Sequence, residues 1–218
     1  APKHTDGTMP KTFYVSKGGA DGANNGTKDN PYLTIGFAED QAVDGRGDMI
    51  VVGTGIYAER VNVEKRNLTI VGACSYPGMV QITGAASPNA NHATLHVGDG
   101  YLRGFRAFNL ELDAQGLVPA LWLESSDAGA GNATTLSNDY RFYLQNIRIQ
   151  SSTPDVGVLL VGATLGRMDD FYVGGARIGL AITGSAENNP DSLEFNNWKF
   201  KDNVDADIAT VTGHQTTG

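Results

Sequence analysis

Apolar residues recur along the first third of the chain in short runs that are separated only by turns. Between residues 47 and 73 these runs are Met49 to Val52, Val61 to Val63 and Leu68 to Val71. A buried helix needs about 10 to 12 residues, and the segments between the runs are too short to hold one. The pattern therefore predicts closely spaced β-strands joined by tight turns.

The segment before these strands has a different period. In "YLTIGFAEDQAV" the apolar positions from Leu33 to Val43 are spaced as on one face of a helix. Thr34 stands where a helix N-cap is expected, and "DGRGD" closes the segment. We predict one short amphipathic helix at about residues 33–43 and no other helix.

From Met49 onward the strands fall into two interleaved sets. The first set is "NLTI" (67–70), "NLEL" (109–112), "NIRI" (146–149), "DFYV" (170–173) and "NWKF" (197–200). The second set is "TLHV" (94–97), "ALWL" (120–123), "GVLL" (157–160), "GLAI" (179–182) and "DIAT" (207–210). Spacings of mostly 22 to 28 residues, stretched to 37 by one insertion, indicate a solenoid of about six coils.

One polar residue opens each strand of the first set. A single coil cannot bury its own inward residues, so consecutive coils must stack with their strands in parallel. The opening residues then lie one above the other, where a side-chain amide satisfies a bend and bonds to its neighbour. We predict a structural ladder of Asn67, Asn109, Asn146, Asp170 and Asn197.

Composition agrees with one all-β domain. The chain has 218 residues, 28 glycines and only 18% charged residues, as expected where many tight turns bring backbone close to backbone. We predict an extended N-terminal arm over residues 1–12 and a single β-helix domain over residues 13–218, with coils at about 49–212. A lone cysteine, Cys74, excludes an intramolecular disulfide framework.

Charge and hydropathy exclude two kinds of partner. The formal charge of −8 and the pI of about 4.9 argue against nucleic acid, because phosphate binding needs clustered Lys and Arg. No apolar run reaches the roughly 18 residues of a membrane span. The start "AP" fits either a removed initiator Met or a cleaved secretory signal, so localisation stays open on this point.

Two adjoining phrases resemble a known family. "NPYLTIGFAEDQAV" followed by "GDMIVVGTGIYAERVNVEKRNLTIVGA" is similar to the opening of pectin-lyase-like right-handed parallel β-helix proteins. The resemblance implies a single-stranded right-handed β-helix whose first coil is capped by the short helix. It implies little about activity, because this fold carries polysaccharide lyases and hydrolases, phage tail spikes and non-catalytic virion proteins.

Candidate catalytic residues are few. Asp169 and Asp170, with Arg177 shortly after, resemble the polygalacturonase arrangement, but the Gly-His-Gly element between them is absent. Asp170 belongs to the ladder, and Asp169 is expected to be a solvated turn carboxylate. A calcium-dependent lyase would need a carboxylate cage, for which Glu111, Asp113 and Glu124 form no motif.

Other suggestive residues favour structural roles. His92 and His96 lie four apart on a strand, which gives no shared face for a metal ion. The "RGD" of residues 46–48 is part of the first-strand phrase. A sugar platform is conceivable if several aromatics face outward together, although core packing is the commoner role; they are Trp122, Tyr140, Phe142, Tyr143, Tyr172 and Trp198. We expect no catalytic, metal-binding or cofactor-binding residues.

The absence of a catalytic motif favours assembly over catalysis. "DIATVTGHQTTG" follows the last strand with no covering helix, so we expect a partner or a second copy to cover that end, with a trimer as one arrangement. The leading hypothesis is a non-enzymatic bacteriophage virion protein, made in the host cytoplasm and attached to capsid or tail. The alternatives are a glycan-binding or glycan-cleaving tail spike domain, and a secreted polysaccharide lyase or hydrolase.

Overall fold

A computed structural model describes most of the chain. The described residues are 9–23, 25–84, 93–98, 102–114, 119–124, 142–150, 156–163, 166–184 and 193–211, with the backbone alone for 210 and 211. Most of the predicted arm lies outside these residues, as do His92 and Tyr140.

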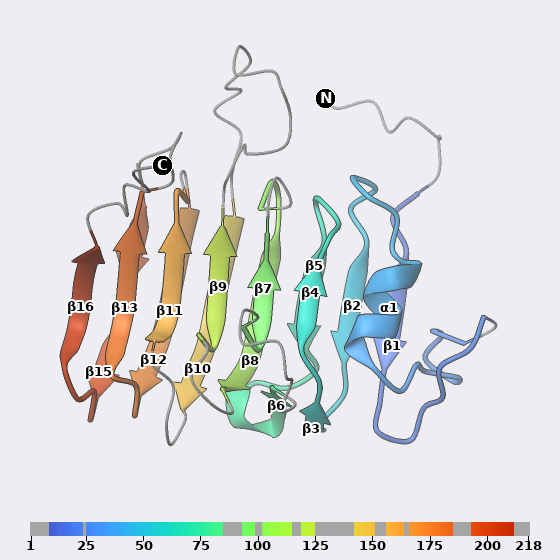
Figure 1. Cartoon of the computed structure of the whole chain (residues 1–218). Coiled ribbons are helices and arrows are strands. Elements are labelled where there is room, and N and C mark those ends of the chain that lie inside the picture. The colour runs from blue at the N-terminus through green and yellow to red at the C-terminus, as the bar shows by residue number, and fades with distance from the viewer. Residues whose placement is uncertain are drawn as a thin grey trace, which may run out of the picture.

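Two sheets contain all the described strands (Figure 1). The first sheet holds β1 (Thr12–Val15), β2 (Met49–Val52), β3 (Gly55–Ala58), β5 (Thr69–Gly72), β6 (Val80–Thr83), β8 (Arg106–Asp113), β10 (Phe142–Gln150), β12 (Gly166–Gly174), β14 (Glu194–Asn196) and β15 (Lys199–Lys201). The second sheet holds β4 (Val61–Val63), β7 (Leu95–Val97), β9 (Leu121–Glu124), β11 (Val156–Val161), β13 (Ile178–Thr183) and β16 (Ala206–Val211).

Every strand pair among the described residues is parallel, and each strand pairs with its counterparts in the neighbouring coils. The chain thus winds as a right-handed parallel β-helix, the hand that parallel crossovers nearly always take. This confirms the predicted fold class. The six strands of the second sheet mark successive coils across the molecule in Figure 1.

Inward side chains form columns along the axis of the solenoid. In one column of the first sheet each residue pairs in register with the next and is fully buried: Ile50, Ile70, Ala107, Leu144 and Met168. Each large member contributes about 1.5 to 3 kcal/mol of burial. Because no coil could bury its own residues alone, the stacked columns account for the regular repeat seen in the sequence.

Helix α1 (Ile35–Gln41) covers the first coil, as predicted, within slightly narrower bounds (Figure 1). The Thr34 hydroxyl accepts a hydrogen bond from the Phe37 amide (3.2 Å), which is a standard N-cap. The Glu59 carboxylate, from the turn after β3, accepts from the Ile35 and Gly36 amides (both 2.9 Å). A side chain of the first coil therefore fixes where the helix begins.

The "RGD" segment is a buried structural turn. Arg46 and Asp48 form an ion pair that is nearly inaccessible to solvent. The Asp48 carboxylate also accepts from the Lys11 amide (2.8 Å) and the Val43 amide (2.9 Å). Thr12 already belongs to β1, so pairing with the first coil begins inside the segment that the sequence assigned to the arm.

Four of the five predicted ladder residues lie one above the other in successive coils: Asn109, Asn146, Asp170 and Asn197. Asn67 does not join them, because β5 pairs with β8 at Thr69 and Arg106, which places Asn67 beside Gly104, and Asn67 Nδ2 donates to the Gly45 carbonyl (3.3 Å).

All five residues nevertheless share one backbone conformation. Their φ angles lie between 53° and 57°, in the left-handed region that Asn and Asp tolerate better than other non-glycine residues. Asn146 Nδ2 donates to Asn109 Oδ1 (2.8 Å), and Asn197 Nδ2 donates to Asp170 Oδ1 (2.7 Å). The ladder residue bends each of β8, β10 and β12. We call the parts before the bend, with β14, the first limb, and the parts after it, with β3, β6 and β15, the second limb.

Candidate functional site

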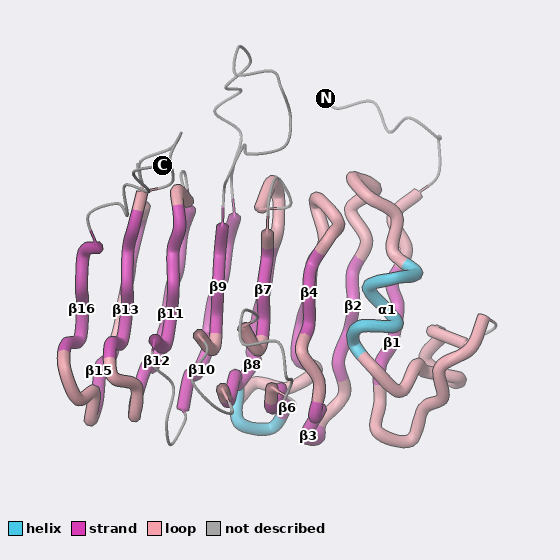
Figure 2. The backbone as a smooth tube through the Cα atoms, in the orientation of Figure 1, coloured by secondary structure: helices cyan, strands magenta, loops and turns pink. Residues whose placement is uncertain are grey.

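A groove runs over the outer face of the second limb, beside the turn at residues 73–79. One hollow of about 600 Å³ lies over β10, β12 and β15, and another of about 480 Å³ lies over β6, β8 and the end of β10. Both hollows are lined by Tyr76 and Arg148, so we treat them as one groove, the second-limb groove. The 3₁₀-helix η1 (Pro77–Met79) lies beside β6 and β8 (Figure 2) and packs on both strands. Its residues Pro77 and Gly78 line the groove.

Strand alternation explains which side chains face the groove. Inward positions of the second limb carry apolar residues such as Leu112, Ile149 and Val173, which are fully buried. The residue before each of these faces outward. In register across five strands, the outward row is Gln81, Glu111, Arg148, Tyr172 and Lys199. The sequence thus places five polar or aromatic side chains in a line along the solenoid axis.

Arg148 is at the centre of this row. Its Nε lies 3.5 Å from Glu111 Oε2, an ion pair that is too long to be a hydrogen bond. Its other nitrogens donate to the Tyr76 hydroxyl and to Gln150 Oε1, and its guanidinium lies 5.3 Å from the ring centre of Tyr172. Arg148 therefore connects the turn at 73–79 with β8 and β12.

The end of the groove over β8 is acidic. Glu111 and Asp113 lie two residues apart on one face of β8, and Gln81 Nε2 donates to Glu111 Oε1 (3.1 Å). Burial raises the pKa of Glu111; Asp113 adds to this rise and Arg148 opposes it. A carboxyl group of raised pKa beside a second carboxylate is the pairing that general acid–base hydrolysis of a glycoside requires.

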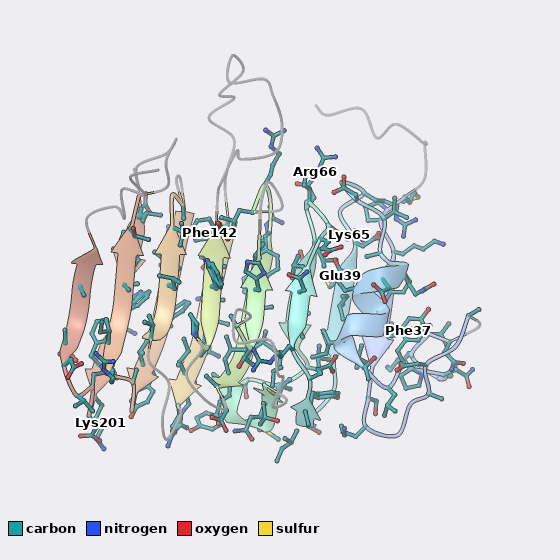
Figure 3. The ribbon with its side chains drawn as sticks, in the orientation of Figure 1. Phe37, Glu39, Lys65, Arg66, Phe142 and Lys201 are labelled. Carbon is teal, nitrogen blue, oxygen red and sulfur yellow. The ribbon has the colours of Figure 1, made fainter. Side chains whose placement is uncertain are left out.

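The opposite end, over β15, is basic. Lys199 and Lys201 line it, together with Asn197 and Asp170 at the bend. Lys201 Nζ lies 3.8 Å from Asp202 Oδ2, with both side chains largely exposed. Lys201 is labelled in Figure 3, where it projects from the end of β15. Cationic groups thus gather on one part of a chain whose formal charge is −8.

Asp169 is not the solvated turn carboxylate expected from the sequence. It lies within β12 on the first limb and is only 6% exposed. Burial alone would raise its pKa, but hydrogen bonds from Asn196 (2.8 Å), Tyr143 (3.0 Å) and Arg167 (2.8 Å) outweigh burial and hold the pKa below its usual value. All three donors come from the outer face of the first limb, so Asp169 completes a closed hydrogen-bonded network.

The structure does not bring Asp169, Asp170 and Arg177 into one site. Asp170 is in the ladder, where hydrogen bonds from Asn197 and then Gln145 lower its pKa. Arg177 pairs instead with Asp205, at 2.7 Å between Nε and Oδ2. The three residues therefore serve separate contacts.

The aromatic residues do not form one outward platform either. Phe142 is buried (Figure 3), and Trp198 stacks on Phe171 at 4.6 Å between ring centres. Trp122 packs on the second sheet against His96, whose Nδ1 lies 2.9 Å from Asn62 Oδ1. Of the described members of the set, only Tyr172 lines the second-limb groove.

The described ranges hold neither a metal-binding cluster nor a membrane-spanning helix. Within them, no three His, Cys, Asp or Glu side chains converge in a way that could hold a metal ion. Glu124, one of the lyase candidates, lies near His96 on the second sheet, with 3.7 Å between Oε2 and Nε2. No helix among the described residues is long and apolar enough to cross a bilayer.

Most of the groove residues were not predicted from the sequence. Tyr76, Gln81, Arg148, Lys199 and Lys201 were not proposed as functional, and Glu111 and Asp113 were considered only for calcium. The available signal was the coil alignment itself, since the residues two places after the last four predicted ladder residues fall in one row. Tyr76 gave no such signal, because a turn brings it to the groove.

Comparison with known proteins finds similarity in fold alone. No protein-family model matches the chain, and no curated protein matches it. Pectin methylesterase PemA from Erwinia chrysanthemi aligns at 14% identity over 87% of this chain and 66% of its own, with a TM-score of 0.47. A carrot pectin methylesterase aligns at 13% identity over 94% of this chain and 90% of its own, with a TM-score of 0.41. XylC in complex with xylose aligns at 10% identity over 92% of this chain and 67% of its own, with a TM-score of 0.42. These likenesses are too remote to transfer residue roles.

Proposed function

We propose that this protein binds a polysaccharide, and that the sugar chain lies along the second-limb groove. The observation that carries the proposal is the outward row that crosses five strands, with Arg148 at its centre, Tyr172 next to it, and Tyr76 bonded to Arg148 from the turn at 73–79. A row along the axis of a solenoid offers an extended ligand repeated contacts at intervals of about 4.8 Å.

The residue types suit a sugar ligand. The face of an aromatic ring packs against the apolar C–H face of a sugar, while its hydroxyl stays available for hydrogen bonds. Gln81, Gln150 and Asn197 supply amides that both donate and accept, which matches the hydroxyl groups of a sugar. Parts of the groove are open to solvent, so a polymer can extend beyond both ends.

Binding to a panel of polysaccharides, measured by affinity electrophoresis and then by calorimetry, tests the proposal. The variants Tyr172→Ala and Tyr76→Ala should each weaken binding of the best ligand about tenfold, because each removes one aromatic ring on which a sugar can stack. Stacking of a nucleic-acid base on an aromatic ring contributes roughly 1 to 3 kcal/mol, and we expect a similar contribution here. Tyr14→Ala, on the first coil, is the matched control and should bind as the unchanged protein does.

The same samples are assayed for new reducing ends. Release of reducing ends that stops in Glu111→Gln would make the groove a hydrolytic site in addition to a binding site. The proposal is overturned if no polysaccharide binds, or if binding is unaffected in both groove variants while the control loses it.

A second candidate function is the virion role expected from the sequence. One observation favours it: Phe195, Val204 and Ile208 on the last described coil expose 37%, 76% and 57% of their surface. Exposed apolar side chains close together are typical of subunit contacts. Copurification with phage particles, lost in Val204→Lys with Ile208→Lys but kept in Tyr172→Ala, would support this role. Absence of the intact protein from purified particles would contradict it.

A further inference from the structure

The two ends of the second-limb groove have opposite balances of charge, although Arg148 also lines the acidic end and Asp170 the basic end. Glu111 and Asp113 line the hollow over β8, and Lys199 and Lys201 line the hollow over β15. Glu111 and Lys199 lie in the same cross-strand row, with Arg148 and Tyr172 between them. Three strand intervals separate them, which is about 14 Å.

A ligand of a single charge would meet repulsion at one end. A polyanion attracted by the two lysines would also extend over Glu111 and Asp113, and a polycation would meet Arg148 and the lysines. Salt screens such interactions over about 8 to 10 Å, which is less than the separation of the ends, so each end acts on its own part of the ligand.

Both ends retain capacity to bind a further charge. Among the residues that the structure describes, no hydrogen bond or ion pair engages the Asp113 carboxylate or the Lys199 ammonium. Glu111 has one amide donor and a loose ion pair at 3.5 Å, so its carboxylate also has room for another partner. The pKa of Glu111 is raised by burial, to which Asp113 adds, and Arg148 offsets the rise only in part.

We propose that the preferred ligand is a zwitterionic polysaccharide, with an amino substituent over Glu111 and Asp113 and a carboxylate, phosphate or sulfate over Lys199 and Lys201. This inference rests on the proposed function and names the ligand class for the same groove. Tyr172 and Tyr76 contact the uncharged part of the chain between the two substituents.

Four oligosaccharides of equal length separate the contributions of the two charges. They are de-N-acetylated hyaluronan, with amine and carboxylate on alternating sugars; hyaluronan, with carboxylate alone; chitosan, with amine alone; and chitin, with neither. Calorimetry with the full chain, in EDTA and at low salt, should give de-N-acetylated hyaluronan the lowest Kd, by about tenfold over each singly charged ligand, as expected for one charge-assisted contact.

Two pairs of substitutions test which end binds which charge. Glu111→Gln with Asp113→Asn should reduce the affinity for the doubly charged ligand to that for hyaluronan. Lys199→Gln with Lys201→Gln should reduce it to that for chitosan. Lys28→Gln with Asp29→Asn changes exposed charges near the first coil and is the matched control, with no expected effect.

The outcomes distinguish this inference from the proposed function. If hyaluronan or chitosan binds as tightly as the doubly charged ligand, or if the groove variants keep the preference, the zwitterion inference is overturned and glycan binding stands. If none of the four binds and no other polysaccharide does, both fail. Thermal denaturation of each variant confirms that lost binding does not reflect unfolding.

Discussion

The two limbs of β8, β10 and β12 belong to the same strands, yet their outer faces differ in how completely the polar groups are satisfied. On the first limb the Asp169 carboxylate accepts from Asn196, Tyr143 and Arg167. On the second limb Glu111 has one amide donor and a longer ion pair. We therefore expect stability to depend more on the first limb and the proposed polysaccharide binding to depend on the second.

The bend between the limbs offers the largest expected effect. Asn146→Leu should destabilise the fold by about 3 kcal/mol. The substitution leaves polar groups at the bend without a hydrogen bond, and it places a leucine in the left-handed backbone region, which leucine disfavours. Asn146→Gly keeps the backbone conformation and should cost less than half as much. Urea denaturation measures both. Equal midpoints for the two variants would mean that the left-handed conformation is not what Asn146 supplies.

On the closed first limb, Asp169→Asn should cost about 1 to 3 kcal/mol because it removes the charged acceptor of three donors. Polysaccharide binding should stay unchanged, since Asp169 does not line the groove. Urea midpoints and calorimetry on the same preparation check both parts. A binding loss at full stability would place Asp169 in the functional site after all.

On the open second limb, Glu111→Gln should give the reverse result, with weaker binding of amino-bearing ligands and a stability change within about 0.5 kcal/mol of zero. The isosteric amide keeps the hydrogen bond to Gln81 possible. If the variant unfolds at markedly lower urea, the second limb is as structural as the first and the comparison fails.

The pH dependence of stability should separate the limbs in sign. The pKa of Asp169 is lowered in the folded state, so its stabilisation is present above its unfolded pKa of about 3.9 and is lost as pH falls through the folded value. The pKa of Glu111 is raised, so its ionisation lowers stability as pH rises from about 4.3 towards the folded value. Urea midpoints from pH 3 to 7 should show Asp169→Asn losing acid sensitivity and Glu111→Gln gaining stability at the neutral end.

The smallest effect is expected at Arg177, the cation first considered beside Asp169 and Asp170. Arg177→Gln removes an exposed pair with Asp205 and should cost at most about 1 kcal/mol. Neither polysaccharide binding nor any reducing-end release should change. A loss of either function would bring the three residues back together as a site.

The sequence predicted the β-helix and its capping helix because both arise from short-range patterns. Thr34 and the apolar spacing after it mark the helix, and the shared offset of Asn109, Asn146 and Asn197 marks the coils. These positions have the same environment in every coil, so they repeat in the sequence.

The groove could not be predicted in the same way, because its residues differ from coil to coil. Glu111, Arg148 and Tyr172 occupy equivalent outward positions but share no chemistry, so no repeat indicates them. Tyr76 reaches the groove from a turn, through a contact with Arg148 that spans 72 positions. Asp169 was misjudged because three donors from two neighbouring strands and its own strand bury it.

The cross-strand row also gives the binding surface a modular length. Each coil contributes one outward side chain to the row, so inserting or deleting a whole coil changes the reach of the groove in steps of about 4.8 Å and leaves the remaining contacts in register. Adding one coil would therefore lengthen the proposed binding surface by one strand interval and let it contact a correspondingly longer stretch of polymer. If the proposed binding holds, exchanging the side chain two places after a ladder residue would change the specificity of one coil at a time.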